Sequence, residues 1–435
     1  MMNYRILADG HTVHNDTWQT GLNNNDIIIG PSGAGKTRGY VKPNILQTAM
    51  QGKESMIITD TKGQLCRELG GLLRQHGYNV LELNLADCSR SCCGYNPLEF
   101  VRYDKASDSY NTQDIMRIAA ILTPVESNDA FWDYYARQLL AAMISYVLEC
   151  LPRCEHNLNT VVRLFRETGT KNFDKLFAEL SEIAPDSFAA TQYQMFRLSQ
   201  SAEKMYSSTL GILAEKLSVF AVGGVTKLFT HPQRVRFYDL ANKKTAVFLR
   251  ISDTDRSMDR LATLFYTQAL QNLCGYADRQ PGGRLPVPVR LYLDDFAAAA
   301  DCCIPDFDKI TSVIRSREIS VSVILQSLSQ LEAAYSHAKA LTILNNADHL
   351  LYLGGQDVET AKYISIKADK SVSTVLNMPL DCAYLFTRGK KPEQVRKYTL
   401  ENHPLYAETP EHRRQIRESA AERSPEPEIS RSLSA

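Results

Sequence analysis

Eight short apolar runs recur along the chain, and each leads into a turn or a helical segment. Runs that are apolar at nearly every position are typical of parallel strands covered by helices on both faces. The pattern therefore predicts an α/β fold with a mainly parallel sheet. The runs occupy residues 26–30, 55–60, 78–83, 245–251, 289–295, 320–326, 349–355 and 382–388.

Between residues 104 and 236 this rhythm stops, and apolar residues recur with the period of a helix. We expect an all-helical domain over 104–236, inserted between the two parts of the α/β domain at 1–103 and 237–402. Residues 403–435 are charged, contain Pro and Ser and have few large apolar side chains, so we expect them to be disordered. The two clearest helical faces carry Ala136, Leu139, Leu140, Met143 and Val147, and Leu210, Leu213, Leu217 and Phe220.

The composition says more about where the protein is located than about its function. Lys+Arg and Asp+Glu both total 49, so any binding of a polyanion has to come from a local groove. The longest apolar runs, such as 139–148, reach about half the length of a membrane span. The ten cysteines include no Cys-x-x-Cys pair, and the polar leader at 1–18 does not fit a signal peptide. We expect a cytoplasmic protein, with peripheral attachment to the membrane left open.

The first apolar run enters a glycine-rich turn, DIIIGPSGAGKT at residues 26–37. This is the G-x-x-x-x-G-K-[ST] pattern in the strand context that a phosphate-binding loop requires. Its backbone amides can surround phosphates, Lys36 can bridge the β- and γ-phosphates, and Thr37 can ligate Mg²⁺. The alternative is a turn with an idle lysine. The expected ligands are ATP and Mg²⁺, and the loop residues are Gly30, Pro31, Ser32, Gly33, Ala34, Gly35, Lys36 and Thr37.

A second acidic motif follows the apolar run LYL, where the chain reads LYLDD at residues 291–295. Acids at the carboxyl end of a parallel strand face the ligand crevice of an α/β sheet. Asp294 is expected to hold the metal shell, and Asp295 to activate the attacking water. The alternative is that the acids cap the next helix, which needs only one of them.

Two arginines and a glutamine could complete the site. Arg315 and Arg317 end a predicted helix, where the helix dipole alone favours a cation. The same position can present a guanidinium to the γ-phosphate of a neighbouring subunit. Gln326 ends the following strand and can orient water in the crevice. The spacing alone does not decide between these roles.

Taken in order, these residues resemble the type IV secretion coupling proteins, ATPases that feed DNA or protein to conjugation machines, and most closely those of Gram-positive bacteria. The resemblance extends over about residues 20–400. It is carried by the stretches TGLNNNDIIIGPSGAGKTRGYVKPNILQ, IITDTKGQL, GYNPLEF, DAFWDYYARQLL, LYLGGQDVETAKYIS and, most specifically, IPDFDKITSVIRSREISVSVILQSLSQLEAAY.

This resemblance implies a RecA-like motor with an inserted all-helical domain, assembled as a hexameric ring around a channel. It implies that Arg315 acts as an arginine finger on the neighbouring subunit and that Gln326 senses the γ-phosphate. The implied partners are single-stranded DNA with a relaxase-type protein, and the type IV secretion channel. A basic stretch at 388–398, RGKKPEQVRKY, is a candidate for lining the channel, although charged loops are usually solvated surface.

The chain departs from the family pattern in three places. It has DDFAA at 294–298 where the family has Asp-Glu-Phe-Ala-Asn, so Asp295 is one methylene shorter than the expected glutamate. It has DTKGQ at 60–64 instead of Asp-Pro-Lys-Gly-Glu, and we assign that stretch no role. Relatives commonly begin with transmembrane helices, whereas the loop here lies near residue 1, so we expect a separate membrane partner, a truncated sequence or a relative without an anchor.

Two other functions stay open. The short acid in the DD motif favours an ATP-binding docking adaptor that hydrolyses little. A small-molecule phosphotransferase would need an acceptor site, for which the sequence offers no motif.

Overall fold

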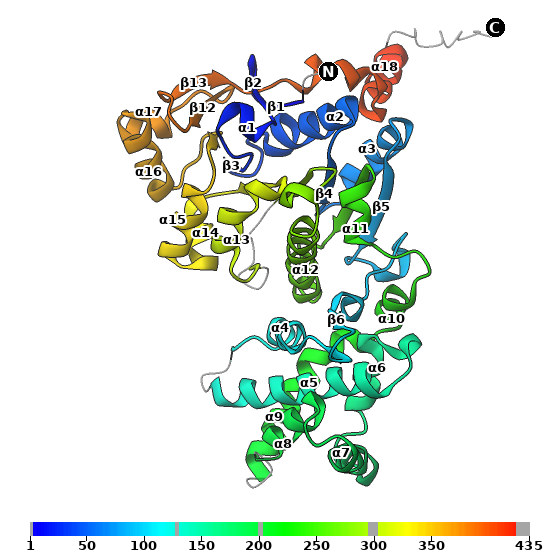
Figure 1. The fold of residues 1–435 in the computed structure, drawn as a ribbon. Helices are drawn as coiled ribbons and strands as arrows, with labels where there is room; N and C mark the ends of the chain where they lie inside the picture. The colour runs from blue at the N-terminus through cyan, green and yellow to red at the C-terminus, as the bar shows by residue number, and fades with distance from the viewer. Residues whose placement is uncertain (1–2, 127–129, 199–202, 295–302, 423–435) are drawn as a thin grey trace, which may run out of the picture.

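The computed structural model describes residues 3–126, 130–198, 203–294 and 303–422 (Figure 1). Within these ranges one large sheet has the strand order β13-β12-β11-β3-β10-β9-β4-β8-β5. All eight predicted apolar runs form strands of this sheet. These eight strands are β3 (Asp26–Ile29), β4 (Ser55–Thr59), β5 (Asn79–Asn84), β8 (Thr245–Arg250), β9 (Val289–Leu293), β10 (Ile319–Leu325), β11 (His349–Tyr352) and β12 (Cys382–Thr387). The ninth strand of the sheet, β13 (Glu393–Arg396), was not predicted.

Seven neighbouring strands, from β11 to β5 in the sheet order, run parallel, and β12 and β13 add an antiparallel edge. In the centre, Leu325 of β10 pairs with Ile29 of β3, and Val323 pairs with Leu293 of β9. The carboxyl ends of β3, β10 and β9 therefore meet at the same edge of the sheet. The α/β prediction with a mainly parallel sheet is confirmed.

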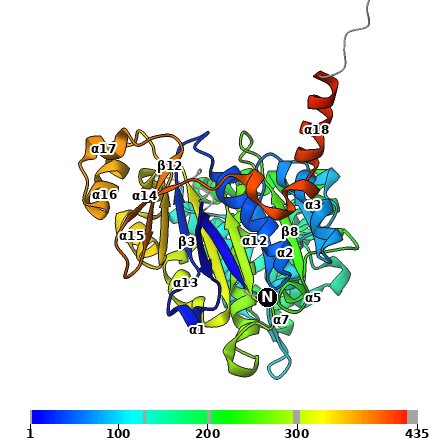
Figure 2. The same cartoon turned by 90° about the horizontal axis from the view of Figure 1, so that it is seen from above.

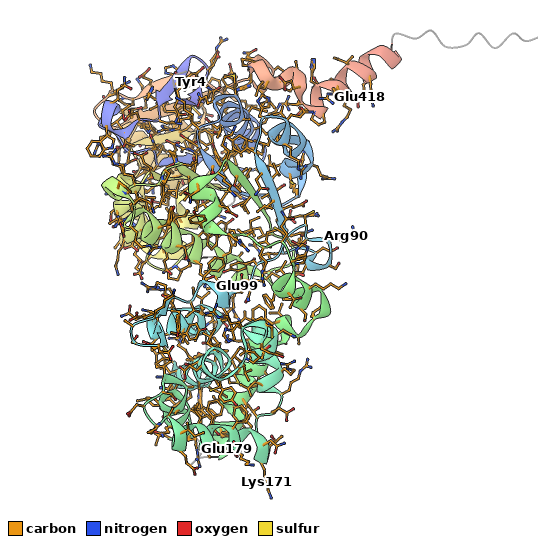
Figure 3. All side chains as sticks on the ribbon, turned by 45° about the vertical axis from the view of Figure 1, so that its right-hand side comes forward. Tyr4, Arg90, Glu99, Lys171, Glu179 and Glu418 are labelled. Atoms are coloured by element: carbon orange, nitrogen blue, oxygen red, sulfur yellow. The ribbon has the colours of Figure 1, made fainter. Side chains whose placement is uncertain are left out.

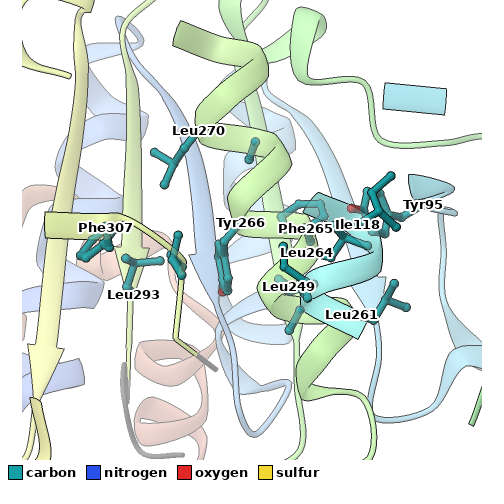
Figure 4. Packing of buried hydrophobic residues seen from close by; sticks show 14 of the residues in the cluster. Tyr95, Ile118, Leu249, Leu261, Leu264, Phe265, Tyr266, Leu270, Leu293 and Phe307 are labelled. Atoms are coloured by element: carbon teal, nitrogen blue, oxygen red, sulfur yellow. The ribbon is translucent and has the colours of Figure 1, made fainter. Parts of the chain in front are cut away.

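Helices cover both faces of the sheet, and the alternation of side chains along β3 shows how. Ile28 packs in the cluster that contains α2 (Lys42–Gln51) and α3 (Gln64–Gln75), whereas Ile27 and Ile29 belong to the cluster on the opposite face. On that second face, Tyr266 and Leu270 of α12 (Asp259–Ala277) lie among strand residues (Figure 4). Further helices are α11 (Phe237–Asn242), α13 (Phe307–Val313), α14 (Leu328–Tyr335), α15 (His337–Asn345), α16 (Val358–Ala368) and α17 (Val372–Leu376).

A second group of helices, α4 to α10, lies beyond one end of the sheet and comes from the chain between β5 and α11 (Figure 1). Glu99 lies near the junction of the two parts, and Lys171 and Glu179 lie at the far end (Figure 3). The described helices there are α4 (Thr112–Leu122), α5 (Ala130–Cys150), α6 (Leu158–Phe165), α7 (Lys171–Ile183), α8 (Phe188–Arg197), α9 (Glu203–Ser218) and α10 (Gly223–Thr230).

The long central helix α5 buries the five apolar residues that the sequence placed on one face. Of the second predicted face, Leu213, Leu217 and Phe220 are buried and Leu210 is half-buried. One short hairpin, β6 (Tyr103–Asp104) and β7 (Ser109–Tyr110), precedes α4 and was not predicted. Because β5 and β8 are adjacent in the sheet, the helices can be inserted between them without separating other strands.

No single helix in the described parts of the chain is long and apolar enough to cross a membrane. Two consecutive helices, Tyr206–Ala221 and Gly223–Thr230, are long and apolar enough when taken together, but they meet at an angle of 71°.

A buried ion cluster anchors the strand that carries the phosphate loop. Arg5 of the hairpin β1 (Tyr4–Ala8) and β2 (His11–His14) binds Asp26 through two nitrogens, at 2.8 and 2.9 Å. Arg290 lies 3.4 Å from the same carboxylate, and the Tyr40 hydroxyl donates to it at 2.6 Å. Burial raises the pKa of Asp26, but the charges of Arg5 and Arg290 and a bond to His349 outweigh it and hold this pKa well below its usual range.

The segment after residue 402 is folded where we predicted disorder. The turn Pro404–Glu408 and helix α18 (Pro410–Glu422) lie beside α2 and α3 (Figure 2). Leu405 is buried, and His403, 2% exposed, bonds Gln47 of α2 at 3.1 Å. The prediction of disorder is wrong for this segment. A few buried side chains, such as Leu405 and His403, hold it in place because helix α2 offers a surface on which they can pack. Residues 423–435 lie outside the described residues.

Candidate nucleotide-binding site

The loop between β3 and the first helical turn has a backbone shape that requires glycine. Gly33 and Gly35 have φ angles of +79° and +91°, which side chains other than glycine's rarely tolerate. At Gly30, an added Cβ would lie 3.0 Å from the Cβ atoms of Ala34 and Leu353. The loop then enters η1 (Thr37–Val41), one turn of π-helix that continues into α2. The glycines are thus structural requirements of the tight turn.

Lys36 points back into this turn. The residue is 8% exposed, and its Nζ donates to the carbonyl oxygens of Gly30 at 2.7 Å and Pro31 at 3.2 Å. The ammonium is therefore held inside the curl of the loop, where a phosphate oxygen can exchange for a carbonyl. A lysine in this place is the point charge that phosphate loops use.

The first acid of the DD motif, Asp294, lies in contact with the phosphate loop. Thr37 donates from its hydroxyl to Oδ2 of Asp294 at 3.1 Å, although 257 residues separate them. Their strands lie on either side of β10, and all three end at the same edge. A hydroxyl and a carboxylate side by side are the hard oxygen ligands that suit Mg²⁺. Asp295, the predicted activator of water, lies outside the described residues.

A cavity of about 480 Å³ lies at this edge of the sheet, in the size range of small-molecule sites. It brings together the loop, Asp294 and Gln326, which follows β10 and is exposed. The residues that line it are Pro31, Ser32, Gly33, Gly35, Lys36, Thr37, Arg38, Lys42, Thr59, Asp60, Thr61, Lys62, Gln64, Leu65, Asp294 and Gln326.

The DTKGQ stretch at 60–64, to which we assigned no role from the sequence, forms the wall of the cavity after β4. Asp60 accepts hydrogen bonds from the backbone N–H groups of Gln64 at 3.0 Å and Cys66 at 2.9 Å, and so caps α3. Reading the end of every parallel strand as a wall of one crevice would have found this stretch, because β4 ends at the same edge as β9.

Two more cations, Arg38 and Lys42, line the cavity and were missed in the sequence. Arg38 forms ion pairs with Glu401 and Glu411, and Lys42 contacts Glu411 at 3.2 Å. Burial raises the pKa of Glu411, but its bonds to these two cations outweigh burial and lower it. The folded C-terminal segment is therefore tied directly to the rim of the cavity. This contact is between residues more than 360 positions apart, and no local pattern marks it.

Arg315 and Arg317 lie at the other end of β10 from the loop. They form a short turn before the strand, and seven strand residues span roughly 23 Å. Arg315 donates to the carbonyl of Thr17 at 3.1 Å, and Arg317 pairs with Asp278 at 2.7 Å. The structure therefore does not bring either arginine to the loop of its own chain. A finger role toward a neighbouring subunit stays a prediction.

The basic stretch 388–398 is a hairpin, not a free loop, because Glu393–Arg396 forms β13. Arg388 pairs with Asp348 at 3.0 Å, and Lys397 donates to the carbonyl of Ala34 at 3.0 Å. These two cations are engaged within the chain, and the channel-lining role stays a prediction.

The architecture and the site together define the class of the protein. A phosphate loop follows β3, a glutamine follows the adjacent β10, and an acid in contact with the loop threonine follows β9. Helices cover both faces, and a helical part is inserted between two sheet strands. This is a RecA-like P-loop fold with an inserted, mainly helical part. The sequence predicted this fold, but not the hairpin β6–β7 in the inserted part.

Comparison with known proteins gives the family. The model of the family described as "Type IV secretory system Conjugative DNA transfer" matches residues 3–372, and the chain belongs to that family. The predicted resemblance to coupling proteins is confirmed. "Protein VirD4" of Rhizobium radiobacter is 28% identical over 353 residues, which cover 78% of this chain and 47% of that protein. "Conjugal transfer protein TraG" of Escherichia coli is 28% identical over 125 residues, 28% of this chain and 18% of that protein. The chain spans about half the length of its VirD4 relatives.

Solved structures of conjugative coupling proteins have a fold similar to that of this chain. The conjugative coupling protein TrwB, lacking its first 70 residues and in complex with sulphate, has a TM-score of 0.63 at 19% identity, covering 86% of this chain and 85% of that one. A TrwB complex with the non-hydrolysable ATP analogue ADPNP has a TM-score of 0.62 with the same identity and coverage.

Proposed function

We propose that this protein is an ATP-driven motor that delivers DNA, or DNA with a bound protein, to a type IV secretion channel. The single observation that carries the proposal is the contact of Thr37 with Asp294 beside the enclosed Lys36. The family's role in conjugative DNA transfer supplies the cargo. That TrwB has been solved with ADPNP and with ADP and Mg²⁺ supports ATP and Mg²⁺ as the ligands of the similar fold here.

In this proposal each polar group of the crevice has one task. The loop amides and Lys36 hold the phosphates, while Thr37 and Asp294 hold the metal, which neutralises charge that develops on the phosphate oxygens. Gln326 lies where an amide can orient water. Asp295 is the proposed general base. Arg315, too far along β10 to serve its own chain, acts on the site of the next subunit.

A ring follows from that division of labour. A site completed by a neighbour needs a heterologous interface, and such interfaces form a ring when the rotation between subunits closes. We propose a hexamer around a channel for single-stranded DNA. Because phosphate contacts repeat around a ring, DNA binding should depend steeply on salt.

The test is ATP turnover by the purified full chain, with and without single-stranded DNA. Turnover that DNA stimulates and that Lys36→Ala abolishes supports the motor. Lys105→Ala, a change at an exposed lysine outside the cavity, is the matched control and should leave turnover intact. Turnover that is unaffected by Lys36→Ala would refute the proposal.

A docking adaptor is the second candidate, favoured by the shorter acid at residue 295. It predicts tight ATP binding with negligible turnover. Asp295→Glu separates the two. A rise in rate shows a motor limited by the reach of its base, since displacements near 1 Å can cost on the order of 10²-fold. No turnover in either protein supports the adaptor.

A further inference from the structure

Hydrogen bonds anchor the DTKGQ loop at the wall of the cavity. The two carboxylate oxygens of Asp60 cap the first turn of α3. Gly63 has a φ of +62°, and an added Cβ would lie 2.8 Å from the guanidinium of Arg250. The carbonyl oxygen of Gly63 accepts from Nε of Arg67 at 2.9 Å, so hydrogen bonds hold the chain on both sides of Lys62. The loop therefore presents one lysine from a defined position, as phosphate-recognition sites require.

Lys62 differs from the other cations of this cavity. Lys36 is bonded to loop carbonyls. Arg38 is paired with Glu401 and Glu411, and Lys42 with Glu68 and Glu411. Lys62 is exposed, and among the residues that the structure describes it has neither a hydrogen bond nor an ion pair. An ammonium that faces a cavity with its donors unused is available to an anionic ligand.

The order of the strands says which part of the ligand it can reach. Along the common edge the sequence is β3, β10, β9, β4, so Lys62 lies beyond Asp294 when viewed from the loop. Thr37 and Asp294 would hold a metal that neutralises the terminal phosphates of a triphosphate, and the γ-phosphate would then lie toward β9. Strand β4, and with it Lys62, is on that side.

We propose that Lys62 contacts the γ-phosphate of a nucleoside triphosphate bound by its own chain, and so discriminates triphosphate from diphosphate. This inference rests on the proposed ATP-binding function. It gives the DTKGQ stretch a role that differs from that of Lys36: the loop lysine serves both nucleotides, whereas Lys62 serves only the one with a third phosphate.

The test measures binding of ADPNP and of ADP, each with Mg²⁺, to the full chain and its variants. Lys62→Ala should weaken ADPNP binding roughly ten- to hundredfold, the usual worth of one charged hydrogen bond, and change ADP binding less than about twofold. Lys62→Arg should restore part of the loss, because it keeps the charge. Lys105→Ala should change neither affinity.

Preserved ADP binding in Lys62→Ala also shows that the variant is folded. Equal losses for both nucleotides, or no loss for either, would overturn the inference. The proposed function fails separately: if the wild-type chain binds neither nucleotide, or if Lys36→Ala binds as the wild type does, the loop is not a nucleotide site at all.

Discussion

Acidification should release the C-terminal segment from α2, and His403 is the group responsible. The backbone N–H of Leu405 donates to Nδ1 of this imidazole at 3.1 Å, so Nδ1 carries no proton and Nε2 donates to Gln47. Protonation of Nδ1 would break the first bond and place a charge in a buried site. Burial accordingly lowers the pKa of His403 to about 4.

The size of the effect follows from linkage. An unfolded histidine has a pKa of about 6.5, so below that pH the released segment binds a proton that the docked segment refuses. The stabilisation is complete above pH 6.5 and is lost as the pH falls toward 4. Between pH 7.5 and 4.5 the group should reduce the free energy of opening by about 2 to 3 kcal/mol.

Hydrogen exchange of the Leu405 and Tyr406 amides measures this opening directly, once the rates are corrected for the intrinsic effect of pH. His403→Gln cannot be protonated in this range, so its opening free energy should change by about 2 to 3 kcal/mol less than the wild type's between the two pH values. His337→Gln, at an exposed site, controls for the loss of a histidine. Parallel pH profiles for wild type and His403→Gln would refute the reasoning.

Three further changes test other parts of the fold and site. Asp26→Asn removes the carboxylate of the buried ion cluster and should lower the free energy of unfolding by about 3–5 kcal/mol. Asp278→Asn breaks a surface ion pair and should cost less than about 1 kcal/mol. Denaturant unfolding measures both. Gly63→Ala should destabilise the fold by about 1–2 kcal/mol, because residue 63 has a positive φ and the added methyl group would lie against the guanidinium of Arg250. Gly71→Ala adds its methyl group in open space on helix α3 and should stabilise the fold by up to about 1 kcal/mol. Thermal unfolding compares the two variants. Glu411→Gln should tighten MgATP binding about two- to fivefold, because it removes one negative charge beside Arg38 and Lys42, although each cation keeps a second carboxylate, Glu401 or Glu68. Calorimetry giving unchanged or weaker affinity would contradict this.

Much of the fold could be predicted because its signals are local. Each buried parallel strand is an uninterrupted apolar run, and the loop glycines are adjacent in sequence. The contact of Thr37 with Asp294 spans 257 residues, yet it follows from a rule of topology, since parallel strands place their carboxyl ends on one edge. Motif and strand order together were therefore sufficient to place Thr37 and Asp294 beside each other.

The remaining features depend on contacts that no local pattern records. Strand β13 has one buried residue, Val395, and takes its conformation from its partner β12. The C-terminal segment has the composition of a disordered tail, and it folds because α2 offers a surface to Leu405 and Tyr406. The sequence does not single out Lys62, because only the fold shows that this lysine lines the cavity. In each case the deciding partner is distant in sequence.

The claim on which the proposed function depends is that Thr37 and Asp294 form one metal site beside Lys36. Calorimetric titration of the full chain with ADPNP, with and without Mg²⁺, tests it most directly. The wild type should bind more tightly with Mg²⁺, Lys36→Ala should lose binding in both conditions, and Asp294→Asn should lose only the gain from the metal. An Asp294→Asn protein that keeps the full gain from Mg²⁺ would contradict the claim.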